Sequence, residues 1–235
     1  MEKKLLVITG ASDGIGRSIA EIFIANSWDV VNLSRKLCSV PKVVSLSIDL
    51  SIQNSINILE KLLSEIIIGK RIICIVHNAA AYQKDNITNL ASENLRSILE
   101  VNVVAPLRIN QLLLPYMLEG SSILYIGSTL SEKAVPNAAS YSISKHTSVG
   151  MMRATTQDLA QFGIYSACIC PGFTNTKMLQ QHLSHNEHLI SSITNNICMQ
   201  RLVEPNEIAN LVFFSANNSI INGAVLHANL GQIES

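Results

Sequence analysis

The chain has 235 residues, of which 48% are hydrophobic and 14% are charged, so it can bury one sizeable core. Its 17 lysine and arginine residues balance 17 aspartate and glutamate residues, which excludes a global field that attracts nucleic acid or an anionic membrane. No apolar run reaches the ~18 residues of a membrane span. The five cysteines form no C-x-x-C pair, so we expect a soluble, cytoplasmic protein with reduced thiols.

Short apolar runs alternate with longer segments of helical periodicity along the chain. We expect strands at residues 4–9, 29–33, 42–46, 72–77, 123–127, 164–170 and 224–228. We expect helices at residues 15–26, 52–68, 90–117, 141–162 and 205–216. This alternation predicts an α/β protein, a single Rossmann-type domain over residues 1–235. Its doubly wound parallel sheet should have about seven strands, with helices on both faces.

Ligands of such sheets bind beyond the carboxyl ends of the strands, so residues that follow a strand are the first candidates for a site. Only residues 173–201 break the alternation, because this stretch is polar, carries no clear strand pattern and exceeds the usual connection of ~4 to 6 residues. We expect this segment to be a lid over the site, with a plain surface excursion as the alternative.

The first predicted strand runs directly into the sequence TGASDGIG at positions 9–16 and then into a helix. Glycine permits a tight turn and close backbone approach, while a helix N-terminus offers free N–H groups and a positive dipole end to phosphate. A ligand-free turn is the alternative, but the strand, turn and helix order favours a dinucleotide-binding loop. The candidate cofactor contacts in this loop are Gly10, Asp13, Gly14 and Gly16.

After the second predicted strand the chain reads Ser34-Arg35-Lys36, where NAD-specific Rossmann sites carry an acidic residue. An arginine pairs with a 2′-phosphate through charge-assisted hydrogen bonds, and no carboxylate stands at this position to repel the phosphate. Ser34 and Arg35 therefore favour NADP(H) over NAD(H). A solvated basic pair without a ligand is the alternative.

Tyr141 and Lys145 are four residues apart in a predicted helix, so their side chains share one face. Ser128 follows the fifth predicted strand, at the edge where ligands bind. A phenol titrates near pH 10, and acid–base catalysis near neutrality requires ~4 kcal/mol of stabilisation of its anion. One cation at ~4 Å supplies about that much at an effective dielectric of 20. These three residues are the predicted catalytic group.

The glycine spacing, Ser128, Tyr141 and Lys145 together resemble the short-chain dehydrogenase/reductase family, with matching motifs in order from Thr9 to Gly231. The general pattern is most similar to 3-oxoacyl-acyl-carrier-protein reductases. The resemblance implies an NADPH-dependent hydride transfer between nicotinamide and a carbonyl or alcohol carbon, in a homodimer or homotetramer. The alternatives are sugar, steroid or pteridine-type alcohol dehydrogenases of the family, or a non-catalytic NADP-binding regulator.

The same resemblance assigns Asn102 as a fourth catalytic residue, which interrupts a helix and holds a water that links the lysine to solvent. A core asparagine satisfied by backbone groups is the alternative. Asp49 matches an adenine-binding aspartate and equally suits a helix N-cap. His77 and Ala80 replace the outer residues of the family's Asn-Asn-Ala-Gly segment. The further cofactor contacts implied are Ser12 and Ile15 in the glycine loop, together with Asp49, Leu50, Asn78, Ala79, Tyr141, Lys145, Pro171, Gly172, Thr174 and Thr176.

Three histidines, His182, His185 and His188, are spaced three residues apart. Side chains at this spacing rotate progressively around a helix rather than converge on one ion, and no carboxylate or cysteine completes an obvious site. We therefore predict no metal site. Asn229-Leu-Gly231 departs from the family's common Asp-Gly-Gly near the C-terminus, which puts the usual packing of that end at a subunit interface in doubt.

Overall fold

The computed structural model describes residues 4–182 and 187–232. Its strands are β1 (Leu5–Thr9), β2 (Asp29–Ser34), β3 (Val44–Ser47), β4 (Ile73–His77), β5 (Ser122–Ile126), β6 (Tyr165–Pro171) and β7 (Val225–Ala228). Within these residues the seven strands form one parallel sheet in the order β3-β2-β1-β4-β5-β6-β7. The order reverses between β1 and β4, which places the ligand crevice of a doubly wound sheet at their carboxyl ends.

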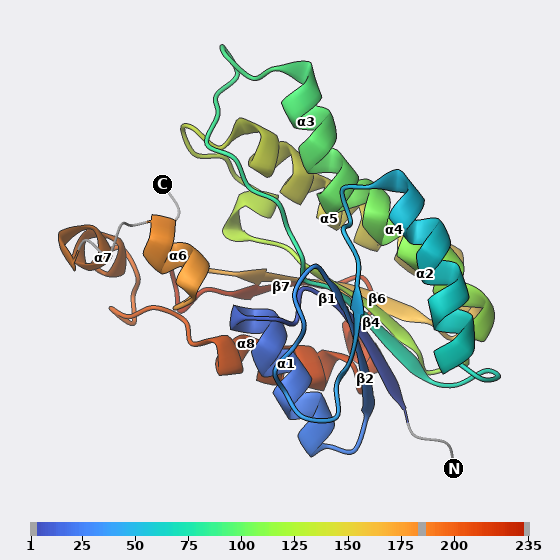
Figure 1. The fold of residues 1–235 in the computed structure, drawn as a ribbon. Coiled ribbons are helices and arrows are strands. Elements are labelled where there is room, and N and C mark those ends of the chain that lie inside the picture. Colours follow the sequence, from blue (N-terminus) through green and yellow to red (C-terminus); the bar gives the residue numbers. More distant parts are fainter. Residues whose placement is uncertain (1–3, 183–186, 233–235) are drawn as a thin grey trace.

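Helices cover both faces of the sheet, as predicted (Figure 1). They are α1 (Gly14–Ala25), α2 (Gln53–Ile66), α3 (Ser92–Leu99), α4 (Ala105–Leu113), α5 (Ala139–Leu159), α6 (Lys177–His182), α7 (Glu187–Thr194) and α8 (Pro205–Ser215). On one face Val7 belongs to the buried cluster with Leu59 of α2 and Ile109 of α4. On the other, Ile8 belongs to the cluster with Ile19 of α1. Successive strand residues point to opposite faces, so a strand covered on both sides is apolar throughout.

The predicted continuous helix over residues 90–117 is wrong. The structure has α3, a π-helical turn η1 (Glu100–Val104), α4 and a 3-10 turn η2 (Leu114–Tyr116) instead. Pro106 explains the break, because proline has no N–H and its ring clashes with the carbonyl four residues earlier, which here belongs to Asn102. The wider π-helical turn accommodates this interruption of the hydrogen-bond ladder.

One strand boundary also differs from the sequence prediction. β3 begins at Val44 rather than at Lys42, because Lys42 has a φ of 70° and lies in the left-handed region, outside strand geometry. Residues 173–201 carry no named strand in the part that the structure describes, but contain the short helices α6 and α7. Both helices lie at the left of the view in Figure 1.

Candidate active site

The glycine loop joins β1 to α1 at the point where the strand order reverses. Gly10 has a φ of 74° and Gly14 a φ of 54°, and both values favour glycine. A Cβ atom on Gly16 would lie 2.2 Å from the carbonyl oxygen of Gly10 and 2.5 Å from Nδ2 of Asn78. The start of α1 therefore approaches the loop backbone as closely as glycine alone allows.

The end of β4 braces this loop. The Thr9 hydroxyl oxygen accepts hydrogen bonds from the backbone N–H groups of Asn78 and Ala79, both at 3.0 Å. Asn78 Nδ2 donates in turn to the carbonyl oxygens of Thr9 at 3.1 Å and Gly10 at 3.0 Å. Asn78 and Ala79 thus lie against the loop, and Asn78 links the two central strands of the sheet.

Asn32 in β2 is a second brace, which the sequence analysis missed. Its Oδ1 atom accepts a hydrogen bond of 2.9 Å from the backbone N–H of Ala11. Its Nδ2 atom donates to the hydroxyl oxygens of Ser34 at 3.2 Å and Ser45 at 3.3 Å. Asn32 therefore connects the glycine loop to the turn that carries Ser34 and Arg35. A polar residue inside a buried apolar strand was the available signal, since such a group needs partners.

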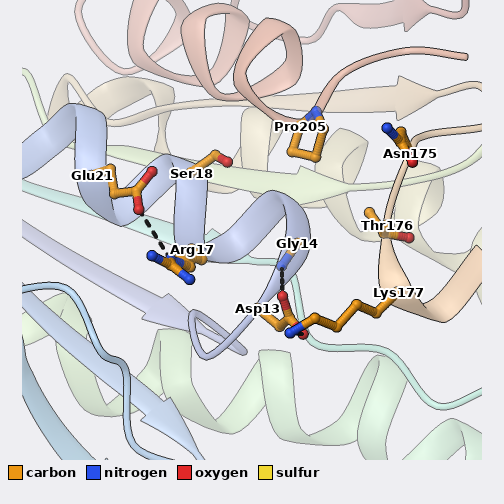
Figure 2. A pocket seen from close by; sticks show the side chains of 9 residues that line it. All are labelled: Asp13, Gly14, Arg17, Ser18, Glu21, Asn175, Thr176, Lys177 and Pro205. Atoms are coloured by element: carbon orange, nitrogen blue, oxygen red, sulfur yellow. Dashed lines mark hydrogen bonds and ion pairs between the residues drawn. The ribbon is translucent and has the colours of Figure 1, made fainter.

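Asp13 lies at the start of α1, beside a pocket of about 370 Å³ (Figure 2). Its carboxylate accepts a hydrogen bond of 2.8 Å from the N–H of Gly14 and pairs with Nζ of Lys177 at 3.0 Å. The hydrogen bond from Lys177 is the main reason that the pKa of the Asp13 carboxyl is lowered. The pocket is lined by Asp13, Gly14, Arg17, Ser18, Glu21, Asn175, Thr176, Lys177 and Pro205.

Arg35 and Asp49 lie near one another at the ends of β2 and β3. Asp49 accepts hydrogen bonds from the N–H of Ser51 at 2.9 Å and its hydroxyl at 2.7 Å. These bonds, and to a lesser degree the charge of Arg35, lower the pKa of Asp49. The predicted N-cap role of Asp49 is wrong, because Ile52 occupies that position of α2. Leu50 is buried in the core.

The turn after β6 brings Thr176 to the glycine loop. Thr174 is buried, and its hydroxyl donates to the carbonyl oxygen of Gly172 at 2.9 Å. Thr176 instead lies against Gly14, where an added Cβ would be 3.1 Å from its Cγ2 atom. The N–H of Gly172, after Pro171, donates to Ala228 at 3.0 Å. Of the two predicted threonines, Thr176 is therefore the one that faces the loop.

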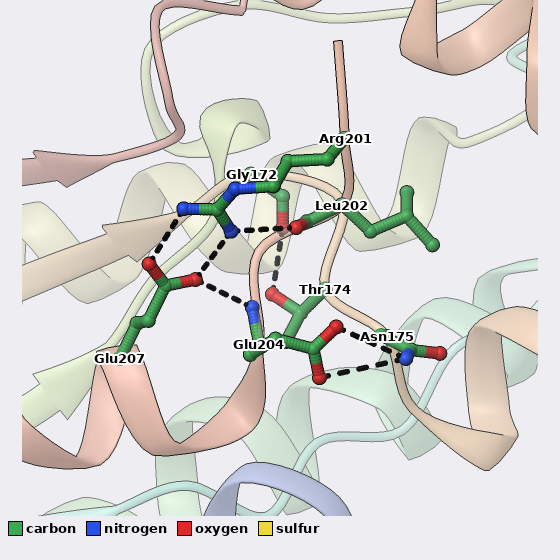
Figure 3. Close-up of polar contacts among 7 residues, drawn as sticks. All are labelled: Gly172, Thr174, Asn175, Arg201, Leu202, Glu204 and Glu207. Atoms are coloured by element: carbon green, nitrogen blue, oxygen red, sulfur yellow. Dashed lines mark hydrogen bonds and ion pairs between the residues drawn. The ribbon is translucent and has the colours of Figure 1, made fainter. Parts of the chain in front are cut away.

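Both ends of the predicted lid are fastened to the start of α8 (Figure 3). Arg201 forms two ion-paired hydrogen bonds to Glu207, at 2.7 and 2.8 Å, and Glu207 also accepts from the N–H of Glu204 at 2.9 Å. Arg201 is the main cause that lowers the pKa of Glu207 to about 2. At the other end, Asn175 Nδ2 donates to Glu204 at 3.2 Å.

The structure brings the predicted catalytic residues to the carboxyl end of β5. Lys145 lies on α5 and is 4% exposed. Its ammonium lies 5.5 Å from the centre of the Tyr141 ring. The same ammonium donates a hydrogen bond of 2.7 Å to the carbonyl oxygen of Ile126. Ser128 directly precedes the 3-10 turn η3 (Thr129–Ser131), which packs against α5. Its hydroxyl oxygen accepts from the N–H of Leu130 at 3.1 Å.

Asn102 lies in the π-helical turn η1 and is 7% exposed. Its Oδ1 atom accepts from the N–H of Ala81 at 2.7 Å. Its Nδ2 atom donates to the hydroxyl of Ser144 at 2.9 Å, and that hydroxyl donates to the carbonyl oxygen of Tyr141 at 2.8 Å. The side chain is therefore satisfied largely by backbone, while it also reaches the helix that carries Tyr141.

The side chains of the histidine series, His182, His185 and His188, lie outside the part of the chain that the structure describes. Among the side chains that it does describe, no group of three or more histidine, cysteine or acidic residues could hold a metal ion. None of the helices in this part of the chain is long and apolar enough to cross a membrane.

Residues 10–232 match a protein-family model that is described as enoyl-(acyl carrier protein) reductase. The chain is 28% identical over 233 residues to carbonyl reductase family member 4 of Xenopus tropicalis, with 95% of each chain covered. It is 27% identical over 243 residues to the 3-oxoacyl-[acyl-carrier-protein] reductase FabG of Escherichia coli (strain K12), covering 98% of this chain and 97% of that protein.

Solved structures share the fold over almost the whole chain. A short chain dehydrogenase family protein from Francisella tularensis matches with a TM-score of 0.90 at 23% identity, covering 98% of this chain and 99% of that one. A 4-hydroxyisoleucine dehydrogenase complexed with NADH gives 0.88 at 21% identity, covering 98% of both chains. An actinorhodin polyketide ketoreductase variant with NADPH gives 0.86 at 25% identity and the same coverage.

Proposed function

The chain belongs to the short-chain dehydrogenase/reductase family of oxidoreductases, and we propose that it transfers hydride between NADPH and a carbonyl or secondary alcohol carbon. One observation carries the proposal: the buried ammonium of Lys145 lies 5.5 Å from the Tyr141 ring centre, on the helix that packs against the Ser128 turn. A phenol beside a cation is suited to donate and accept a proton, and a neighbouring hydroxyl suits a substrate oxygen.

In the reductive direction, Ser128 orients the substrate oxygen and Tyr141 donates a proton to it. A reduced nicotinamide dinucleotide held at the glycine loop would provide the hydride for the carbonyl carbon, so that an alcohol and the oxidised dinucleotide would be the products. Lys145 stabilises the phenolate, and its ammonium keeps N–H groups beyond the one bonded to Ile126. We assign the main-chain carbonyl of Asn102 to a water that returns the proton, because Pro106 cannot donate an α-helical hydrogen bond to it.

The residues at the glycine loop suit a dinucleotide. Gly10 and Gly14 have the positive φ values that a tight loop needs. The N–H of Gly14 is bonded to Asp13, and the N–H groups that follow it in the first turn of α1 suit a pyrophosphate. Ser12, Ile15 and Gly16 belong to the same loop, with Thr176 beside it. We place the adenosine beside Ser34, Arg35, Asp49, Leu50, Asn78 and Ala79, and the nicotinamide beside Pro171, Gly172, Thr174, Thr176, Tyr141 and Lys145.

Arg35 supports NADPH as the cofactor, because its exposed guanidinium directly follows β2 and is suited to charge-assisted hydrogen bonds with a 2′-phosphate. In Arg35→Ala we expect the Kd for NADPH to rise about 10- to 150-fold, while the Kd for NADH changes less than twofold. Fluorescence titration with both cofactors measures the ratio. Lys61→Ala, which removes an exposed cation of α2, is the control. An unchanged ratio in Arg35→Ala would remove this residue from the cofactor assignment.

We propose a 3-oxoacyl thioester as the first substrate to test, because FabG relatives carry the name of such a reductase. The proposed lid at 173–201 presents the exposed apolar side chains Phe173, Met178 and Met199, which suit an apolar chain. We also propose one domain over residues 1–235, a cytoplasmic location and a homodimer or homotetramer. Light scattering on the purified chain measures the oligomeric state.

The decisive experiment replaces Tyr141 with Phe. Oxidation of NADPH is measured against a panel of ketones that includes a 3-oxoacyl thioester. We expect wild type to turn over at least one panel member, and Tyr141→Phe to lose about 10²- to 10⁴-fold in kcat with an unchanged Kd for NADPH. Tyr116→Phe, at a tyrosine of η2, is the matched control. Retained turnover in Tyr141→Phe refutes the acid–base role, and wild type that binds NADPH but reduces nothing favours a regulator.

A further inference from the structure

A buried carboxylate outside α5 binds the first turn of that helix. Asp85, in the segment after β4, is 6% exposed. Its Oδ1 atom accepts a hydrogen bond of 3.0 Å from the N–H of Ser140, and its Oδ2 atom accepts a short hydrogen bond from the Ser140 hydroxyl. Ser140 is fully buried and directly precedes Tyr141. One carboxylate therefore holds the residue next to the proposed proton donor by two bonds.

The main chain of Asp85 holds the same turn. Its N–H donates to the carbonyl oxygen of Asn137 at 3.3 Å, and its carbonyl oxygen accepts from the N–H of Ala139 at 3.4 Å. Asn137 has a φ of 63°, so the chain enters α5 through a left-handed residue that this pairing fixes. The backbone of Asp85 thus binds Asn137 and Ala139, and its side chain binds Ser140, so three of the residues 137–140 at the start of α5 are held by Asp85.

α5 depends on an acceptor from elsewhere in the chain. The first N–H groups of a helix have no partner inside it, and a side chain at the N-cap position usually supplies one. Ala138 holds that position in α5 and offers no side-chain acceptor. Because Ser140 is buried, water cannot replace the missing partner. The carboxylate of Asp85 takes this role, and its negative charge also suits the positive end of the helix dipole.

The segment that carries Asp85, residues 81–85, also contacts Asn102 and Tyr141, two of the proposed catalytic residues. The N–H of Ala81 donates to Oδ1 of Asn102 at 2.7 Å, and its carbonyl accepts from Nδ2 at 3.0 Å. The Tyr82 ring packs edge-to-face on the Tyr141 ring, with centres 5.3 Å apart. Burial raises the pKa of Tyr82, and the charges of Asp85 and Tyr141 add to the effect.

We infer that Asp85 is a positioning residue, which caps α5 from outside the helix and thereby fixes the Tyr141 phenol for proton transfer. The kinetic part of this inference rests on the proposed function. Displacement of a reacting group by about 1 Å costs on the order of 10²-fold in rate. The glycine loop is held separately, by Asn32 and Asn78, so loss of the cap acts on kcat rather than on NADPH affinity.

The test compares Asp85→Ala, Asp85→Asn and Ser140→Ala with the control Asp158→Ala, an exposed aspartate near the other end of α5. Hydrogen exchange of the amides in residues 139–142 needs neither cofactor nor substrate. In Asp85→Ala we expect exchange about 2- to 30-fold faster, the range for loss of a helix cap. Asp85→Asn keeps an acceptor for the Ser140 N–H and should change less. Asp158→Ala should match wild type.

Kinetics then separate positioning from plain stability. In Asp85→Ala we expect kcat to fall about 10- to 100-fold, the Kd for NADPH to change less than twofold, and Asp85→Asn to recover part of kcat. Unchanged exchange in Asp85→Ala overturns the cap. Faster exchange with unchanged kcat overturns the positioning role. If Asp85→Ala does not fold, wild-type exchange and kcat in both Asp85→Asn and Ser140→Ala overturn the inference. Wild type without any turnover refutes the proposed function, while exchange still decides the cap.

Discussion

The ammonium of Lys145 lies 2.7 Å from the carbonyl oxygen of Ile126, the last residue of β5. A buried charge is costly unless it is hydrogen-bonded, and this carbonyl supplies a bond where the strand has ended. The end of β5 therefore fixes the position of the Lys145 ammonium at the carboxyl end of the sheet. The bond also leaves the ammonium 5.5 Å from the centre of the Tyr141 ring.

Lys145→Met removes the charge while keeping a long side chain. Without the cation the phenolate loses its stabilising partner, so we expect kcat to fall at least about 100-fold. The measurement is NADPH oxidation with the best substrate of the ketone panel. Lys61→Met, at an exposed position of α2, controls for the loss of one positive charge and should behave as wild type. A Lys145→Met variant that retains more than a tenth of kcat would contradict the assigned role.

Gly16→Ala tests the close approach within the glycine loop. The added Cβ would lie 2.2 Å from the carbonyl oxygen of Gly10, so the backbone must move. Overpacking of this kind costs about 1–3 kcal/mol, which lowers the Tm of a chain this long by roughly 2–12 °C. We also expect at least tenfold weaker NADPH binding, because Gly10 belongs to the proposed phosphate loop, a loss of about 1.4 kcal/mol.

Gly150→Ala is the matched control for this variant. Gly150 lies on α5 with open space around the position of an added Cβ, so alanine there should be neutral or stabilising by up to about 1 kcal/mol. Thermal unfolding and fluorescence titration with NADPH are measured on both variants. Wild-type affinity in Gly16→Ala would show that the loop does not need this approach.

Local sequence patterns were enough to predict the fold class and the glycine loop, because each pattern lies within one element or one junction. Helical geometry alone predicts that Tyr141 and Lys145, four residues apart, lie on the same face of a helix. The order of strand, glycine-rich turn and helix alone predicts the loop that ends at Gly16. The family resemblance predicts a helix break at Asn102, whereas helical periodicity alone predicts one continuous helix over residues 90–117, because apolar spacing does not reveal the N–H that Pro106 lacks.

The braces of the site could not be predicted in this way. Asp85 and Ser140 are 55 positions apart in the chain, and Asn32 lies 21 positions from the loop residue Ala11. Such pairs meet only when the sheet assembles, and no helical or strand period relates them. A buried polar residue in an apolar strand signals that partners exist, but the sequence does not identify those partners.

His77, at the end of β4, is buried and belongs to a series of side-chain hydrogen bonds within the core. Its Nε2 atom lies 2.8 Å from Oδ1 of Asn110, whose Nδ2 atom donates to the hydroxyl of Tyr125 at 2.9 Å. That hydroxyl is hydrogen-bonded to Thr155 of α5 at 3.0 Å. Desolvation lowers the pKa of His77 from 6.5 to about 4, so the folded chain keeps this ring neutral in mild acid.

This lowered pKa makes stability depend on pH in a defined direction. Between pH 6.5 and 4 the unfolded chain binds a proton at His77 that the folded chain does not, so acidification favours unfolding. The stability that the neutral His77 ring contributes is fully present above pH 6.5 and is lost as the pH falls to about 4, a change of about 3 kcal/mol in the free energy of unfolding.

Other groups titrate in the same window, so the comparison uses His77→Asn, which lacks this proton and leaves the other groups in place. Urea unfolding at pH 7 and at several values down to pH 4 should show wild type losing about 3 kcal/mol more than His77→Asn. Parallel losses in the two proteins would mean that His77 takes up its proton in the folded chain as readily as in the unfolded one.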